Sequence, residues 1–100
     1  MNEKKKIIGY ITLRIRKNWT EVTSLAVSSS ARGYGIGRQL MERMMDLANA
    51  YETNIKLHVS VFNNAAMALY KSLGFVPSKW ILDYYQREEE DAIEMYIVRK

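Results

Sequence analysis

The sequence contains no cysteine, one proline and one histidine among its 100 residues. The absence of cysteine excludes disulfide bonds, thiolate nucleophiles and zinc–thiolate sites. With one histidine and no close carboxylate cluster, a metal ion held by the protein is not expected. No apolar run approaches the roughly 20 residues that span a bilayer. No hydrophobic segment of signal-peptide length follows the basic start MNEKKK. We therefore expect a cytoplasmic protein without a membrane partner.

The composition is that of an ordinary globular protein, with 48% hydrophobic and 26% charged residues. One hundred residues suffice for one core and are too few for two, so we expect a single domain over residues 1–100. The net charge of +4 suits an anionic partner, such as a nucleic acid or a phosphorylated cofactor. The basic residues 4–6 have no interleaved aromatic residues, and the remaining charge is mixed. We therefore expect no nucleic-acid binding.

The first third of the chain predicts a β-hairpin. Residues 20–27, TEVTSLAV, predict a second strand after the short turn KNW. The preceding residues 7–16 alternate with period two, which predicts a strand with one apolar face. The residues of that face are Ile7, Gly9, Ile11, Leu13 and Ile15.

From Arg38 onward the period changes to that of an amphipathic helix. Its methionines, Met41, Met44 and Met45, are expected to fill the core and not to form a binding stripe. The face expected to be buried comprises Leu40, Met44, Leu47, Ala48 and Tyr51. The face expected in water comprises Arg38, Glu42, Arg43 and Asp46.

The second half continues with a strand, a helix and two strands. Residues 54–61 alternate and place His58 on the face opposite the apolar side chains. Residues 63–73 predict a short helix, capped by Asn63 or Asn64 and ended by Gly74 in the left-handed conformation. Residues 75–85 and 92–100 predict two strands, separated by the acidic stretch QREEED. The order β-β-α-β-α-β-β predicts an α/β (α+β) fold with a mixed sheet and packed helices.

Three glycines, Gly33, Gly35 and Gly37, stand directly before the first helix. A glycine-rich loop entering a helix presents free N–H groups at the positive end of the helix dipole, which is a site for a phosphate. The spacing is neither G-x-x-x-x-G-K-S/T nor G-x-G-x-x-G. The alternative is a loop whose glycines only provide positive φ angles.

Two motifs carry a resemblance to a known superfamily. Residues 63–75, NNAAMALYKSLGF, resemble its N-x-x-A-x-x-L-Y-x-x-x-G-F helix. Residues 32–37 resemble its R/Q-x-x-G-x-G/A pyrophosphate loop: Arg32, Gly33, Tyr34, Gly35, Ile36 and Gly37. The superfamily is that of the GNAT acetyltransferases. Within it, the segments EVTSLAV, LHVSVFN and YYQREEEDAIEM look like those of N-terminal (Nα) protein acetyltransferases of the ribosomal-protein-alanine and archaeal type.

The resemblance implies acetyl-CoA as the cosubstrate and an amine, most directly a protein N-terminus, as the acceptor. It implies that residues 32–37 bind the pyrophosphate through backbone N–H groups, together with Arg38. Asn63 would contact the pantetheine arm, and Tyr70 would protonate the departing thiolate. Tyr84 and Tyr85 would line the acceptor slot. The pantetheine and the thioester carbonyl would meet the strand residues Leu25, Ala26 and Val27.

The reaction also requires a base, because an ammonium must lose a proton before it attacks a thioester. His58 titrates nearest to neutrality and is the best candidate on its intrinsic pKa. In the related proteins this position is often Glu and sometimes His. Glu21 matches a second position, where archaeal members can use a His–Glu pair, so either residue is a candidate.

One departure from the family pattern concerns the N-terminal side. Members carry a strand and two helices ahead of the segment that begins near Lys6, and these helices form one wall of the acceptor site. Their absence predicts an open edge and an exposed apolar patch, which a homodimer would cover. The alternatives to an Nα-acetyltransferase are an enzyme that acetylates lysine or a small amine, and a CoA-binding module without activity alone.

Overall fold

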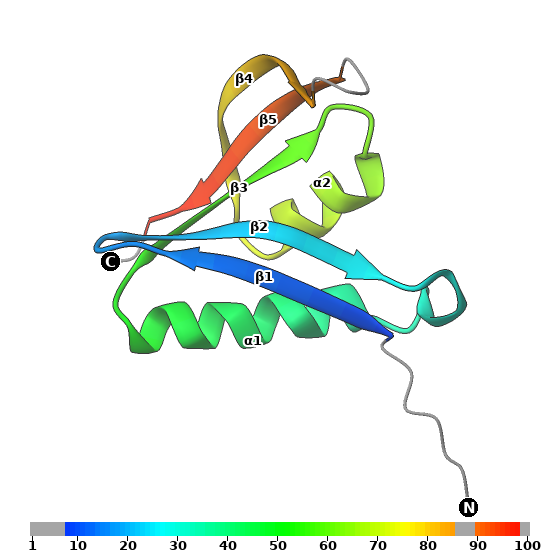
Figure 1. Cartoon of the computed structure of the whole chain (residues 1–100), viewed down its shortest axis with the longest axis horizontal. Helices are drawn as coiled ribbons and strands as arrows, with labels where there is room; N and C mark the ends of the chain where they lie inside the picture. The colour runs from blue at the N-terminus through cyan, green and yellow to red at the C-terminus, as the bar shows by residue number, and fades with distance from the viewer. Residues whose placement is uncertain (1–7, 86–89, 99–100) are drawn as a thin grey trace, which may run out of the picture.

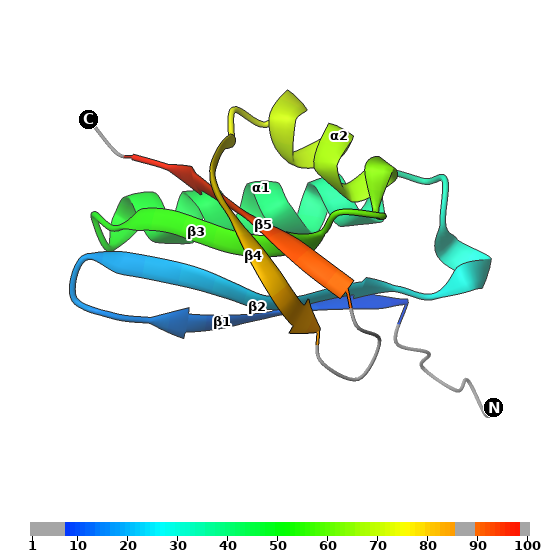
Figure 2. The same ribbon diagram turned by 90° about the horizontal axis from the view of Figure 1, so that it is seen from above.

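The computed structural model describes residues 8–85 and 90–98, and the element order is the expected one. One mixed sheet has the strand order β1-β2-β3-β5-β4, and both helices lie on the same side of it (Figures 1 and 2). The elements are β1 (Gly9–Ile15), β2 (Trp19–Val27), the 3-10 helix η1 (Ser29–Ala31), α1 (Ile36–Ala50), β3 (Asn54–Ser60), α2 (Asn64–Ser72), β4 (Val76–Tyr85) and β5 (Glu90–Ile97). No helix of the described chain is long and apolar enough to cross a membrane.

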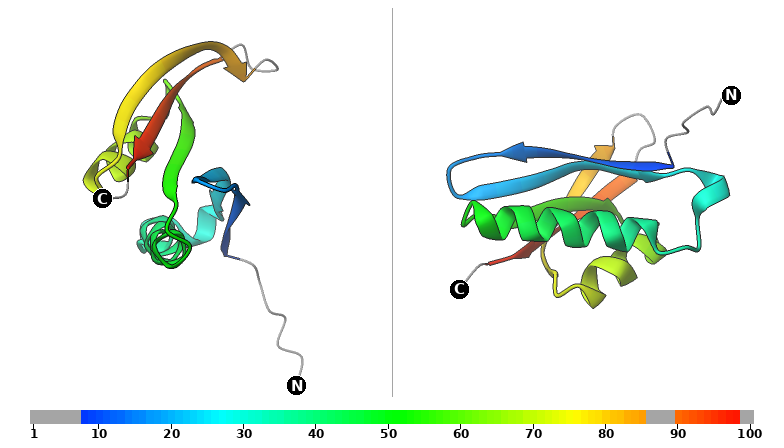
Figure 3. Two further views of the ribbon diagram at one scale, coloured as in Figure 1. Left: turned by 90° about the vertical axis from the view of Figure 1, so that its left-hand side faces the viewer. Right: turned by 90° about the horizontal axis from the view of Figure 1, so that it is seen from below.

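The sheet opens between its second and third strands. β1 and β2 form the predicted antiparallel hairpin along their whole length. β2 pairs in parallel with β3 only as far as Val22, which lies opposite Leu57. At that point Thr23 is an extra residue in β2, because Thr12 pairs with Ser24 while Leu13 pairs with Val22. Beyond this bulge β2 and β3 diverge, as Figure 1 shows, and the sheet is strongly curved (Figure 3).

The core lies between the sheet and the two helices. Of the residues expected to point inward from residues 54–61, Ile55, Leu57 and Val59 are buried, whereas Val61 lies just after β3 and is half-buried. Met41 and Met44 of α1 are buried as well. This confirms that the methionines fill the core. They pack against Tyr70 and Phe75 in the same cluster.

The buried face of α1 is in part the predicted one. Met44 and Ala48 are buried as predicted and Leu40 is half-buried, but Leu47 and Tyr51 are 41% and 61% exposed, and Met41 is buried beside Met44. Both sets of residues have helical spacing, so periodicity alone leaves two overlapping apolar faces. The position of the sheet selects between them.

The first strand also departs from the prediction at its end. Gly9, Ile11 and Leu13 are half-buried, but Ile15 is 47% exposed because it is the last residue before the hairpin turn. Ile7 and the basic residues 4–6 lie outside the described residues.

The short helix α2 begins and ends as predicted. Asn63 is the N-cap, and its side-chain oxygen accepts a hydrogen bond of 3.1 Å from the Ala66 N–H. Gly74 has a φ of +100°. The helix turns Tyr70 into the core, while Ala66, Leu69 and Leu73 pack around it.

The acidic stretch that was expected to separate the last two strands belongs in part to β5. Both Glu90 and Asp91 belong to β5, and Glu90 pairs with Tyr85 of β4, because backbone hydrogen bonds to a neighbouring strand outweigh the low strand propensity of acidic residues. Residues 86–89, 99 and 100 lie outside the described residues.

Candidate active site

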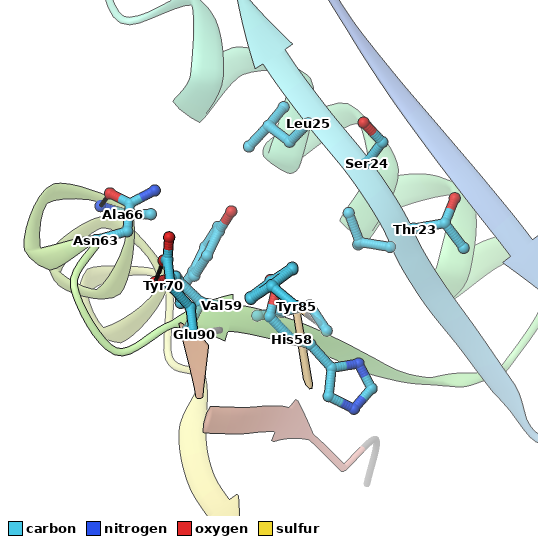
Figure 4. Close-up of a pocket in the computed structure, with 13 residues that line it drawn as sticks. Thr23, Ser24, Leu25, His58, Val59, Asn63, Ala66, Tyr70, Tyr85 and Glu90 are labelled. Atoms are coloured by element: carbon cyan, nitrogen blue, oxygen red, sulfur yellow. Dashed lines mark hydrogen bonds between the residues drawn. The ribbon is translucent and has the colours of Figure 1, made fainter. Parts of the chain in front are cut away.

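A cleft runs through the opening between β2 and β3 and continues to the start of α1. It consists of two adjoining hollows of about 480 and 630 Å³. Four residues line both hollows: Leu25, Asn63, Ala66 and Tyr70. Figure 4 shows Leu25 on the β2 side, facing Asn63 and Ala66, with His58 at the opposite end of the cleft from Asn63.

The β2 wall of the cleft offers main-chain groups. Parallel pairing with β3 ends at Val22, so none of the described strands lies beside the cleft edge of Leu25 and Val27. The Arg32 Nε donates to the Val27 carbonyl at 3.3 Å and ties the loop to this strand. An extended ligand can therefore bind here as an additional strand would. Ala26 shares this segment with them and is half-buried.

The N-terminus of α1 forms the floor of the larger hollow. Gly35 is the N-cap with φ +76°, and no side chain caps the helix. The first bond closed within the helix runs from the Gln39 N–H to the Gly35 carbonyl, so the N–H groups of Ile36, Gly37 and Arg38 precede it. Such groups, together with the helix dipole, fit a phosphate.

The three glycines of this loop differ in backbone conformation. Gly33 and Gly35 have φ values of +89° and +76°, so the positive-φ interpretation holds for both. Gly37 is helical, and a Cβ there would lie 3.7 Å from Leu69 and 3.9 Å from Val27, which is ordinary contact. The fold itself does not require glycine at this position, and the missing side chain leaves the backbone open to close approach by a ligand.

The two arginines and the tyrosine of the loop region are exposed. Arg38 lines the larger hollow, and its Nη2 donates to Ser72 Oγ at 2.5 Å, linking α1 to α2. Arg32 lines the same hollow, while Tyr34 is 76% exposed and lines neither hollow. Backbone and guanidinium groups thus share this end of the cleft.

Tyr70 stands where the two hollows meet. Tyr70 is buried, and burial raises the pKa of its phenol. A phenol with a raised pKa stays protonated at neutral pH and can donate its proton to a developing anion. The position suits the role of an acid.

His58 lies on the helix-free face of the sheet between two carboxylates. Its Nδ1 is 3.6 Å from Glu21 Oε2, and its Nε2 is 3.9 Å from Glu94 Oε1. Burial lowers the pKa of His58, and Glu94 and then Glu21 oppose that shift. A lowered pKa keeps the imidazole neutral near pH 7, as a base must be. The structure therefore brings together the two predicted candidates, His58 and Glu21.

Two tyrosines of β4 surround the imidazole. The Tyr84 ring stacks on His58 with centroids 4.6 Å apart, and its hydroxyl lies 3.4 Å from Nδ1. The Tyr85 hydroxyl donates to the His58 carbonyl at 3.4 Å. Both tyrosines and His58 line a third hollow of about 240 Å³ beside the cleft. Burial raises the pKa of each phenol.

A bulge in β4 places these tyrosines. Ile81 pairs with Ala92 and Tyr85 with Glu90, so three residues of β4 face Asp91 alone. The Asp91 carboxylate accepts 2.8 Å hydrogen bonds from the Asp83 N–H and from Trp80 Nε1. These two bonds lower the pKa of Asp91.

Sequence reasoning missed Glu94, Asp91 and the hydrogen bond from Ser60 to Glu90 at the edge of the cleft. Alternation along residues 90–97 places Glu94 opposite the buried side of β5, but no sequence signal pairs it with His58. The residues that the structure describes contain no group of three metal-ligating side chains placed to hold an ion.

Three comparisons with known proteins bear on this cleft. The model of the Acetyltransferase (GNAT) family matches residues 1–75. N-alpha-acetyltransferase 30 of Saccharomyces cerevisiae is 38% identical over 74 residues, covering 73% of this chain and 42% of that protein. An N-alpha-acetyltransferase of Sulfurisphaera tokodaii is 34% identical over an alignment of 106 positions, covering 90% of this chain and 62% of that protein. The chain thus spans about half the length of these relatives.

A solved structure matches the fold over nearly the whole chain. It is Arabidopsis thaliana Naa50 in complex with the bisubstrate analogue CoA-Ac-MVNAL, with a TM-score of 0.85 and 28% identity. The match covers 92% of this chain and 66% of that one. The arrangement of strands and helices is therefore that of a known enzyme fold.

Proposed function

Because the chain belongs to the acetyltransferase (GNAT) family, as its loop and helix motifs predicted, we propose that it transfers the acetyl group of acetyl-CoA to an amine. The acceptor that we propose is the α-amino group of a protein N-terminus. The observation that carries the proposal is the position of Tyr70, which lines both the hollow at the α1 N-terminus and the hollow that reaches His58. A leaving group bound at one end and an amine bound at the other meet beside this phenol.

The cofactor end of the cleft would hold acetyl-CoA chiefly through backbone groups. The pyrophosphate would take the N–H groups that precede the first bond of α1, with Arg32 and Arg38 adding positive charge. The pantetheine would lie along Leu25 and Val27, beside Asn63. These residues fit the group because the helix start carries no side-chain cap.

The side chains of the cleft would manage two protons. The acceptor ammonium would first give a proton to His58, directly or through a water, with Glu21 3.6 Å from its Nδ1. The neutral amine then attacks the thioester carbon, the carbon–sulfur bond breaks, and a second proton leaves the nitrogen for solvent as the amide forms. The departing thiolate takes the proton of Tyr70, which solvent later restores.

The acceptor assignment rests on the tyrosines and on the relatives. Tyr84 and Tyr85 flank a hollow of about 240 Å³, enough for the first residues of a chain end. The relatives named above are N-alpha-acetyltransferases, and the solved structure binds an analogue that joins CoA to a short peptide. A lysine side chain or a small amine is the second candidate, because the hollow opens to solvent and Arg14 and Glu21 at its rim provide both charges.

The test is turnover with acetyl-CoA, followed as release of the free thiol. We expect acetylation of N-terminal peptides and slower or no acetylation of peptides that carry only a lysine amine, or of polyamines. Activity toward lysine or polyamines alone would assign the second candidate. Binding of CoA without any turnover would identify a CoA-binding module that needs a partner chain.

The base is tested by the pH dependence of kcat/KM. His58→Ala is expected to remove the limb that rises with pH and to lower the rate by about 100-fold at pH 7, because deprotonated imidazole is the acceptor of the proton. The pKa of His58 lies below its ordinary value, so this limb falls on the acid side of 6.5. A limb that survives in the variant would assign the base role to Glu21 or to water.

A further inference from the structure

A row of five charged or titratable side chains crosses the helix-free face of the sheet, with one residue from every strand. The neighbouring members lie 3.7, 3.6, 3.9 and 3.4 Å apart in the order of the strands. They are Arg14 of β1, Glu21 of β2, His58 of β3, Glu94 of β5 and Lys79 of β4.

The backbone register fixes three of the four links of this row. Arg14 pairs directly with Glu21, and Glu94 pairs directly with both His58 and Lys79. Residues directly opposite on neighbouring strands share a face of the sheet, so their side chains lie within reach of one another. Glu21 pairs directly with Lys56 and reaches His58 diagonally, two residues further along β3. The imidazole is the centre of the row, with a carboxylate on each ring edge and a cation behind each carboxylate.

Glu94 is largely buried and lies between His58 and Lys79. Its side chain is only 15% exposed, and its Oε2 also accepts from the Ser78 hydroxyl. A largely buried carboxylate needs partners, and here the imidazole, the lysine and the Ser78 hydroxyl all lie beside it. The acceptor chemistry described above uses Glu21 and His58 and leaves Glu94 without a role.

We propose that Glu94 is a positioning residue, which holds the Nε2 edge of His58 while Glu21 holds the Nδ1 edge, and that Lys79 limits the negative charge that Glu94 presents. This inference rests on the proposed function, in which His58 is the base. The row then keeps the ring in one plane against Tyr84 and makes its proton uptake depend on two residues remote from the cofactor.

The charges act on the imidazole in opposite directions. Burial lowers the pKa of His58 most, Glu94 and Glu21 raise it, and Lys56 and Lys79 lower it. The groups that surround the ring are Glu21 of β2, Lys56 of β3, Lys79, Tyr84 and Tyr85 of β4, and Glu94 of β5, with Arg14 of β1 behind Glu21.

The direct test is an NMR titration, which is simple because His58 is the single histidine. Glu94→Gln removes the carboxylate and is expected to lower the midpoint of the imidazole titration by about one pH unit. Lys79→Gln is expected to raise the midpoint, because Glu94 is then no longer neutralised. Glu94→Asp retains the charge and should move the midpoint less than Glu94→Gln does.

Matched controls separate these local effects from a change in net charge. Glu42→Gln and Lys71→Gln make the same charge changes at exposed positions on the helices and should leave the midpoint in place. An unchanged midpoint in both Glu94→Gln and Lys79→Gln overturns the inference. If Glu94→Gln does not fold, the test rests on Lys79→Gln. A raised midpoint of the imidazole titration in that variant supports the inference, and an unchanged midpoint overturns it.

Kinetics then distinguish this inference from the proposed function. We expect the acid limb of kcat/KM to move with the NMR midpoint, down in Glu94→Gln and up in Lys79→Gln. A loss of rate at every pH without movement of the limb or of the midpoint would mean a merely structural role and overturns the inference. If the NMR midpoint of His58 moves while the acid limb of kcat/KM stays in place, the result supports the action of Glu94 and Lys79 on His58. The same result contradicts the proposed function of His58 as the base.

Discussion

The two ends of the cleft are built in different ways. The cofactor end is made mainly from one continuous segment, residues 25–38, with α2 as its other wall, and that segment offers mainly backbone groups. The acceptor end is made from side chains of all five strands, from Arg14 to Glu94, that meet only because the strands pair. A backbone site depends on local conformation, whereas a side-chain site depends on register and on charge. The substitutions that damage the two ends should therefore differ in kind.

Tyr70 lies between the two ends of the cleft, and Tyr70→Phe is expected to have the largest effect on the rate. Removing the hydroxyl should lower kcat by about 100-fold or more, because the proton is needed only as the thiolate leaves. Affinity for acetyl-CoA should change little, since the ring stays in the core. A wild-type kcat in a folded Tyr70→Phe protein would exclude this residue as the acid.

Gly35→Val tests the backbone character of the cofactor end. A valine is strained at φ +76° and brings side-chain bulk next to the N–H groups of α1. We expect CoA affinity, measured by calorimetry, to fall by about 10- to 100-fold. Inside the protein nothing lies within 4 Å of the added Cβ, so the effect does not come from an internal clash.

Two readouts complete the test of the loop. Tyr34→Ala, in the same loop, changes only an exposed side chain and should leave CoA affinity unchanged. A thermal melt shows whether Gly35→Val is folded. Unchanged affinity in a folded Gly35→Val protein would contradict the site.

Asp91→Ala tests whether the β4 bulge serves the acceptor end. The substitution removes the acceptor for the Asp83 N–H and for Trp80 Nε1, so the Tyr84 ring should lose its fixed position on His58. We expect KM for the peptide to rise by about tenfold while KM for acetyl-CoA stays the same. Asp46→Ala, on the exposed side of α1, is the control. Equal changes in both KM values would indicate general damage to the fold.

The smallest effect is expected at the edge of the sheet that β1 forms, and it concerns association between chains. Ile8, directly before β1, and Tyr10 and Ile15 within it are each about half exposed, at 48%, 49% and 47%. Among the described residues, β1 pairs on one side only. We predict that a second copy covers this edge to form a homodimer. Light scattering across a concentration series should show a dimer, and Tyr10→Lys should shift it toward monomer. An active protein that is monomeric at every concentration would contradict this prediction and show that one chain builds both ends of the cleft.

The predictable part of the site is the part that is local in sequence. The glycine loop, the Asn63 cap and Gly74 each act within a few residues, so spacing and residue type suffice to locate them. The apolar alternation of β3 likewise placed His58 on the face away from the core. Family membership followed from the two motifs, because both are short and contiguous.

What the tertiary structure alone decided is which distant residues meet. Helical spacing left two overlapping apolar faces on α1, and contact with the sheet buried Met41 and left Leu47 exposed. The pairing of β3 with β5 brought Glu94 to His58 across 36 positions, and the β4 bulge turned Tyr84 onto the same ring. Strand order and register are properties of the whole sheet, since each pairing depends on all the others, and no local pattern encodes them.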